Sequence, residues 1–140
     1  YFLVTGENPP VDAFTQVRGG HDWREANFDV NGITLHTAVA SGLGNARKLV
    51  EAIRNGEAKY DFVEVMACPG GCAGGGGQPI KDGFEMAGER APKLYELDKR
   101  RNIRFSHENP EIKKLYEDFL GEPLSEKSHE LLHVHEDHKV

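Results

Sequence analysis

The dipeptide Asn31-Gly32 is the feature that most constrains the fold of this chain. It joins two strand-like runs, residues 25–30 and 33–40. Asn-Gly tolerates the positive φ angles that a type I′ turn requires, and such turns match the twist of paired strands. The sequence therefore predicts a β-hairpin over residues 25–40.

The stretch after the hairpin has the pattern of a β-α-β unit. Residues 44–55 place apolar side chains at helical spacing, and Gly56 stands where helices commonly end. Residues 61–66 then form a short apolar run that is typical of a buried strand. A strand at 33–40, this helix and a strand at 61–66 predict two parallel strands joined by a helix, and hence an α/β fold with a short parallel sheet.

The two ends of the chain carry other predicted elements. Residues 1–13 are expected to be a helix end followed by a turn on Pro9 and Pro10, and residues 14–18 a short strand that Gly19-Gly20 ends.

C-terminal helices are expected at about 84–99, at 111–120 behind Pro110, and at 125–133 within a C-terminal helix and tail (123–140). Ser125 and Ser128 are both candidate caps for the last of these helices.

Composition excludes several classes of function. The formal net charge of the 140 residues is -6 and the basic residues are scattered, so we expect no nucleic-acid partner. No apolar run approaches the roughly 20 residues of a membrane span, and no membrane insertion is expected. Two cysteines are too few for a disulfide-rich scaffold, so their chemistry should be redox or metal binding.

Both cysteines lie in one glycine-rich stretch, EVMACPGGCAGGGGQP, at residues 64–79. Thiolate sulfur binds iron and zinc, and Cys68 and Cys72 could both ligate one metal centre from this loop. Because zinc sites and iron-sulfur cubanes need about four protein ligands, the others would come from another segment or chain. Glycines let the backbone approach a bulky inorganic group closely. The loop follows the carboxyl end of the predicted strand 61–66, where open α/β sheets place their sites.

Other interpretations of this loop remain open. Free cysteines are often small buried hydrophobes. A disulfide between Cys68 and Cys72 would close a very short loop. A phosphate-binding loop is a weaker match, because GGGGQPI lacks the lysine and hydroxyl of that motif.

The loop resembles the third signature of the H-cluster domain of iron-only (FeFe) hydrogenases, approximately ExMxCxxGCxxGGGQP. Similarity continues through VASGLGNARKLVEAIRNG at 39–56 and PLSEKSHELLHVH at 123–135. Every fixed position of the signature is present: Glu64, Met66, Cys68, Gly71, Cys72, Gly75, Gly76, Gly77, Gln78 and Pro79.

The resemblance implies a role for each of these residues. Cys68 would bind a 4Fe-4S cubane, and Cys72 would bridge it to a two-iron subcluster with CO, cyanide and a dithiolate. Met66 would lie beside the dithiolate, which makes Cys72 and Met66 the candidate catalytic residues. The remaining candidate cofactor-binding residues are Gly71, Gly75, Gly76, Gly77 and Gln78. The reaction implied is reversible proton reduction to H₂.

The family's other two signatures, resembling TSCCPxW and MPCxxKxE, do not occur in residues 1–140. We therefore expect this chain to be a C-terminal fragment or split subunit, a partial lobe of a larger H-cluster domain, and to be inactive alone. Its expected partners are the N-terminal remainder of the catalytic subunit and a ferredoxin or similar electron carrier. The expected compartment is the cytoplasm, with the periplasm as the alternative.

Two alternatives accompany this prediction. One is a non-catalytic, hydrogenase-like iron-sulfur protein of cluster assembly or sensing. The second is a zinc metallopeptidase, because HELLH at 129–133 matches the HExxH pattern; Leu131 and Leu132 are more typical of a packing face.

The role of two further groups of residues stays open. Glu64, in the strand that is expected to be buried, is either a hydrogen-bonded structural carboxylate or a proton relay. Four terminal histidines could also collect stray metal or form a polar tail: His129, His133, His135 and His138.

Overall fold

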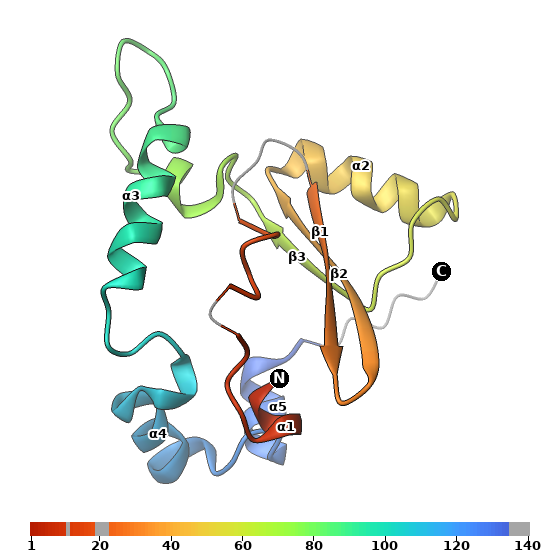
Figure 1. Cartoon of the computed structure of the whole chain (residues 1–140), viewed down its shortest axis with the longest axis vertical. Helices are drawn as coiled ribbons and strands as arrows, with labels where there is room; N and C mark the ends of the chain where they lie inside the picture. The colour runs from red at the N-terminus through yellow and green to blue at the C-terminus, as the bar shows by residue number, and fades with distance from the viewer. Residues whose placement is uncertain (11, 19–22, 135–140) are drawn as a thin grey trace. The chain divides into compact units, whose positions relative to one another are not determined.

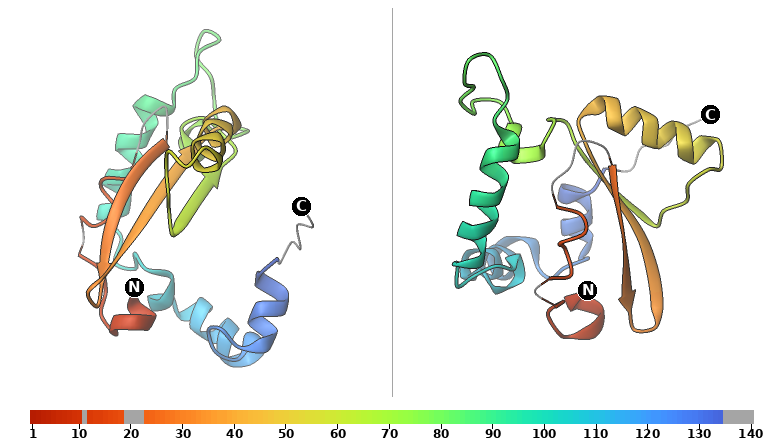
Figure 2. Two further views of the ribbon diagram at one scale, coloured as in Figure 1. Left: turned by 90° about the vertical axis from the view of Figure 1, so that its right-hand side faces the viewer. Right: turned by 45° about the horizontal axis from the view of Figure 1, so that its top comes forward.

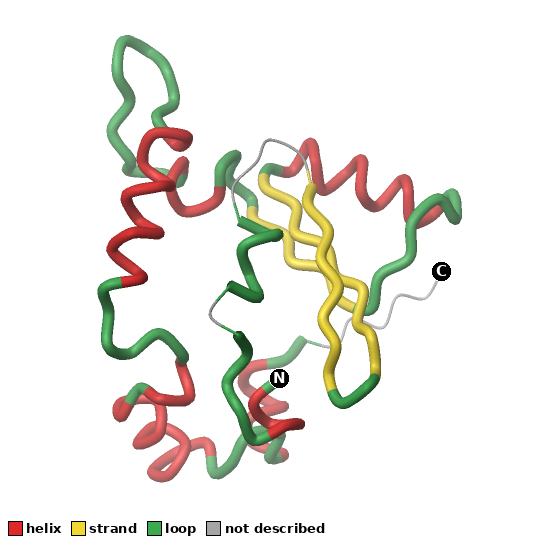
Figure 3. The backbone as a smooth tube through the Cα atoms, in the orientation of Figure 1, coloured by secondary structure: helices red, strands yellow, loops and turns green. Residues whose placement is uncertain are grey.

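A computed structural model describes residues 1–10, 12–18 and 23–134 of the chain. The chain divides into two compact units, Tyr1–Tyr95 and Glu96–Val140, and each is described here by itself. The first unit carries a three-stranded sheet and the second is helical (Figures 1 and 3). Helix α3 (Ala87–Lys99) runs across the boundary between them.

The predicted hairpin is confirmed. Strands β1 (Trp23–Val30) and β2 (Ile33–Ser41) pair antiparallel with Val30 opposite Ile33. The two turn residues have φ angles of 53° at Asn31 and 80° at Gly32, as a type I′ turn requires. The N–H of Gly32 also donates to a carboxylate oxygen of Asp29 at 3.1 Å, which adds a side-chain bond across the turn.

The β-α-β unit is confirmed as well. Helix α2 (Leu43–Arg54) connects β2 to strand β3 (Phe62–Met66), and β2 and β3 pair in parallel. The sheet order is β1-β2-β3. Helix α2 lies across one face of this sheet (Figure 2), where the fully buried Leu49 packs against Ala38 and Ala40. This cluster forms the core of the first unit.

The prediction that the third strand is buried was wrong. Phe62 is 65% exposed and Val65 51% exposed, whereas Val63 packs at the core cluster. The reason is position in the sheet: among the described residues β3 pairs only with β2, so it is an edge strand. An edge strand has a neighbour on one side only, and of its residues Val63 is the one that packs at the core cluster.

The N-terminal prediction was right in part. A one-turn helix, α1 (Phe2–Thr5), ends at Gly6, and the N–H of Ala13 donates to the carbonyl of Pro10 in a turn. The strand expected at 14–18 was wrong, because this segment forms consecutive turns (green in Figure 3). Phe14 instead packs its ring on Phe28, with centroids 5.6 Å apart. Gly19 and Gly20 lie outside the described residues.

The C-terminal helices were predicted with small errors in extent. The helix expected at 84–99 begins at Ala87, because residues 81–84 form a tight turn with a β-bridge. The helix expected at 111–120 is helix α4 (Pro110–Leu115) followed by a π-helical turn, η3 (Tyr116–Leu120). Helix α5 (Glu126–Leu132) is capped by Ser125, whose hydroxyl accepts from the N–H of Ser128. A short 3-10 turn, η2 (Ser106–Glu108), precedes α4. Across the described ranges, no helix is long and apolar enough to cross a bilayer.

Tyr60 links the core to a carboxylate and gives the fold a testable pH dependence. Its phenol donates to Glu25, which also accepts from the indole of Trp23. Burial first, then the hydrogen bond and charge of Glu25, raise the pKa of Tyr60 above its ordinary value of 10.0. The folded state therefore holds this proton more tightly than the unfolded state, and the stabilisation present below pH 10 is lost as the pH rises through the folded pKa.

We accordingly expect the free energy of unfolding to fall as the pH rises above about 10. Denaturant unfolding between pH 8 and 11 measures this dependence. Tyr60→Phe keeps the ring but has no proton to lose, so its pH dependence should be shallower. An equally steep fall in the Tyr60→Phe variant would assign the effect to other groups.

Candidate functional site

The cysteine loop begins where β2 and β3 end together. The N–H of Gly42, just after β2, donates to the carbonyl of Met66, the last residue of β3, at 2.7 Å. After Met66 the chain makes one 3-10 turn, η1 (Gly71–Gly74), which contains Cys72. The loop therefore leaves the carboxyl ends of two parallel strands, as the sequence predicted.

Two positions in the loop are occupied by glycine because other atoms of the chain lie where a Cβ would stand. Gly71 has a φ of 62°, and a Cβ there would lie 2.9 Å from the sulfur of Met66. A Cβ on Gly74 would overlap the carbonyl oxygen of Pro69. A larger residue at Gly74 would displace backbone next to Cys72, whereas one at Gly71 would adopt a strained positive φ and push the Met66 side chain aside.

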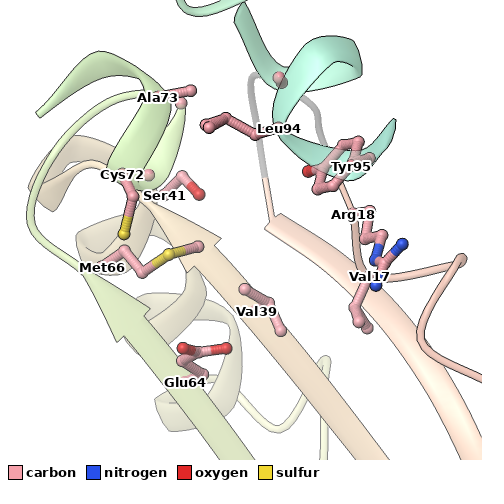
Figure 4. A pocket seen from close by; sticks show the side chains of 13 residues that line it. Val17, Arg18, Val39, Ser41, Glu64, Met66, Cys72, Ala73, Leu94 and Tyr95 are labelled. Atoms are coloured by element: carbon pink, nitrogen blue, oxygen red, sulfur yellow. The ribbon is translucent and has the colours of Figure 1, made fainter. Parts of the chain in front are cut away.

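A cavity of about 270 Å³ opens beside this loop, over the sheet face opposite α2 (Figure 4). Two cross-strand pairs form its floor, Val39 with Glu64 and Ser41 with Met66. The 3-10 turn η1 contributes its first three residues, Gly71, Cys72 and Ala73. Helix α3 contributes Leu94 and Tyr95. The sulfur atoms of Met66 and Cys72 both face this cavity (Figure 4).

The two cysteines have different surroundings. Both are free thiols, so the Cys68 to Cys72 disulfide is not formed. Cys72 is exposed and lines the cavity, which does not fit a small buried hydrophobe. Cys68 is half-buried and lies outside the cavity lining, and its sulfur is 4.0 Å from where a Cβ of Gly75 would stand.

The structure thus brings together only part of the predicted site. Met66, Gly71 and Cys72 line one cavity. The other candidates lie outside the cavity lining: Cys68, Gly75, Gly76, Gly77 and Gln78. Gln78 still touches the site, because its side-chain amide donates to the carbonyl of Cys72 at 3.4 Å.

Sequence reasoning missed the contributions of other elements to this cavity. Ser41 ends β2 beside Met66, and the parallel pairing of two adjacent strand ends could have indicated it. Arg18 and Tyr95 also line the cavity, with the guanidinium 4.9 Å from the ring centroid. Neither has a local sequence signal, since the chain brings them together from 77 positions apart.

Glu64 is not the buried acid that the sequence suggested. It is exposed, it lines the cavity, and its carboxylate has no hydrogen-bond partner among residues 1–10, 12–18 and 23–134. The hydrogen-bonded structural role therefore lacks support. Its side chain shares the sheet face with Met66, two residues along β3.

The HELLH segment forms most of α5. The rings of His129 and His133 meet edge to face, with centroids 4.4 Å apart. Across the part of the chain that the structure describes, no group of three or more His, Cys, Asp or Glu side chains could hold a metal ion. His135 and His138 lie outside the described residues. Leu131 and Leu132 are 53% and 56% exposed, so the packing face expected for them was wrong in this unit.

Comparison with known protein families identifies the chain. Residues 1–76 match the family described as "Iron only hydrogenase large subunit, C-terminal domain". The chain belongs to the iron-only hydrogenase family. Residues 85–135 also match the family described as "Iron hydrogenase small subunit". The resemblance predicted from the cysteine loop is confirmed.

Individual hydrogenases resemble the chain over nearly its whole length. It is 49% identical over 136 residues to the NADP-reducing hydrogenase subunit HndD of Solidesulfovibrio fructosivorans, covering 96% of this chain and 23% of that protein. It is 38% identical over 125 residues to iron hydrogenase 1 of Clostridium pasteurianum, covering 86% of this chain and 22% of that protein. An apo [FeFe]-hydrogenase structure from Chlamydomonas reinhardtii superposes with a TM-score of 0.73 at 42% identity, covering 96% of this chain and 41% of that one.

Proteins with a different role also resemble the chain. A probable cytosolic Fe-S cluster assembly factor of Drosophila persimilis is 39% identical over 131 residues, covering 91% of this chain and 27% of that protein. The chain spans about a quarter of the length of the curated relatives that it matches.

Proposed function

We propose that this chain forms the C-terminal part of the catalytic domain of an iron-only hydrogenase, in which it supplies two of the cysteine ligands of the H-cluster. The observation that carries the proposal is the cavity at the carboxyl ends of β2 and β3, into which Met66 and Cys72 face. Two free thiols, within a loop that matches the whole family signature, give that cavity its chemistry.

The residues present fit part of the H-cluster, the cofactor of the [FeFe]-hydrogenases whose structures resemble this chain. Cys72 is exposed at the cavity, so its thiolate is accessible to iron. Gly71 and Gly74 let the loop pack closely on Met66 and Pro69, which sets the path of the backbone on both sides of Cys72. Two thiolates are half of the four that a cubane needs, so the remaining ligands come from residues outside this chain.

When bound, the cluster supplies the redox-active iron at which protons and electrons combine reversibly, 2H⁺ + 2e⁻ ⇌ H₂. The chain's own residues hold and enclose it. Cys68 and Cys72 would hold the cluster through their thiolates. Met66 places a polarizable thioether against the same cavity. Glu64 is exposed on the floor of this cavity, two residues before Met66 on the same strand.

The proposal implies partners and a compartment. The N-terminal remainder of the catalytic subunit supplies the missing ligands, and a ferredoxin or similar carrier supplies electrons. We place the protein in the cytoplasm, because two free thiols with one exposed persist best in a reducing compartment.

Activity measurements test the proposal directly. After maturation with the hydrogenase assembly enzymes, the 140-residue chain alone should evolve no H₂ and retain no intact cluster. The same chain joined to the N-terminal part of a related catalytic subunit should bind iron and evolve H₂. H₂ evolution by the isolated chain, or an iron-free joined protein, would contradict the proposal.

The second candidate is a non-catalytic relative that works in iron-sulfur cluster assembly. The similarity to cytosolic assembly factors over 91% of this chain favours it. The parent gene separates the two, since an upstream TSCCP-like segment with its proton-transfer cysteine indicates the enzyme and its absence indicates the relative. The hypothesis of a zinc peptidase is not supported, because the described residues offer no third zinc ligand near the histidines of α5.

A further inference from the structure

One face of α3 packs on the cysteine loop. A Cβ at Gly70 would lie 2.6 Å from the Cβ of Ala87, in the first turn of the helix. Arg90, three residues after Ala87, donates a hydrogen bond to the loop. Ala91, four residues after Ala87, lines the cavity. Leu94 follows at the next turn and lines the same cavity (Figure 4). This i, i+3, i+4, i+7 pattern is that of a helix face in continuous contact.

Arg90 makes the polar contact of this face. Its Nη1 donates to the carbonyl oxygen of Ala73 at 3.0 Å, and the side chain is half-buried. Ala73 directly follows Cys72 in the 3-10 turn. Carbonyl groups at the end of a helical turn have no hydrogen-bond donor within the turn. The backbone hydrogen bond from the N–H of Gly75 to the carbonyl of Cys72 is long, at 3.5 Å.

A charged donor makes this bond stronger than its neutral neighbours. Hydrogen bonds from a guanidinium to a carbonyl are about twice as strong as those between neutral groups. The other side-chain bond to this turn, from Gln78 to the carbonyl of Cys72, is longer and exposed. Arg90 is therefore the main polar anchor of the peptide that follows Cys72.

We infer that Arg90 is a positioning residue for the Cys72 thiolate: it fixes the turn that presents this ligand to the cavity and places a positive charge at the peptide that follows Cys72. The inference rests on the proposed function, in which Cys72 binds iron. Neither role follows from the family signature, because Arg90 lies eleven residues after its last position.

The test uses the complete matured catalytic subunit that contains this chain, with three variants. Arg90→Met removes both donor and charge at similar length, and Arg90→Lys keeps the charge and one donor. Lys93→Met is the matched control, because it removes a positive charge one turn further along the same helix from an exposed residue with no bond to the loop. Iron release to a chelator, the electron paramagnetic resonance spectrum and the midpoint potential are measured for each protein.

We expect Arg90→Met to release iron about tenfold faster than the unchanged protein, from the loss of one charge-assisted bond. Its spectrum should change and its midpoint potential should become more negative, because a nearby positive charge favours the reduced cluster. Arg90→Lys should recover most of the potential, and Lys93→Met should resemble the unchanged protein.

The outcomes separate this inference from the proposed function. If the unchanged protein binds no iron, the proposed function fails and the inference fails with it. If the unchanged protein binds iron and Arg90→Met matches it in release rate, spectrum and potential, the inference alone is overturned. Equal effects of Arg90→Met and Lys93→Met would overturn it also, since they would reflect the charge of the helix rather than the bond to Ala73.

Discussion

Replacing Cys72 with alanine is expected to lower H₂ evolution by the complete catalytic subunit more than about 100-fold, because even the loss of a group that only supports a metal ligand costs about 10–100-fold. Bound iron should fall in parallel, since we propose that the Cys72 thiolate would be one of the ligands that hold the cluster. The measurements are iron per polypeptide and the rate of H₂ evolution with a chemical reductant.

The loss should not come from unfolding. Cys72 is exposed and contributes little to packing, so Cys72→Ala in the chain should change the free energy of unfolding by less than about 0.5 kcal/mol. In the iron-free chain an alkylating reagent should modify the exposed Cys72 faster than the half-buried Cys68. A Cys72→Ala protein that keeps its full iron content and turnover would remove the basis of the proposed function.

The fold was predictable where local chemistry and periodicity agreed. Asn31-Gly32 fixed the hairpin, because few dipeptides accept two successive positive φ angles. The helix around Leu49 followed from apolar spacing and the terminal Gly56. The prediction of a strand at 14–18 was wrong. Its apolar residues suit a strand, but Phe14 packs on Phe28, and this tertiary contact cannot be predicted from the local sequence.

The candidate site was predictable only along one stretch of chain. The signature gave Met66, Gly71 and Cys72, which are neighbours in sequence as well as at the cavity. Arg90 was not predictable, because its role depends on how α3 returns to the loop across the turn at residues 81–84. A motif names the residues that touch the ligand, whereas the groups that hold those residues in place come from other elements.

Replacing Gly74 with alanine is expected to disturb the cysteine loop more than the same change at Gly76, which is a fixed position of the family signature. A Cβ at Gly74 would overlap the carbonyl oxygen of Pro69 and lie 3.2 Å from Ala87, so both the loop and the start of α3 would have to shift. A Cβ at Gly76 meets no atom within 4 Å. We expect Gly74→Ala to lower the free energy of unfolding of the chain by at least about 2 kcal/mol, as overpacking against backbone does.

Gly76→Ala is the matched control for this steric argument, because it adds the same methyl group two residues away in the same glycine run. Its free energy of unfolding should stay within about 0.5 kcal/mol of the unchanged chain. Alkylation of Cys72 in the iron-free chain provides a second readout, and its rate should change for Gly74→Ala but not for Gly76→Ala. Equal destabilisation by the two substitutions would mean that the glycine run is needed for its backbone freedom as a whole, not for the close approach of Pro69 to Gly74.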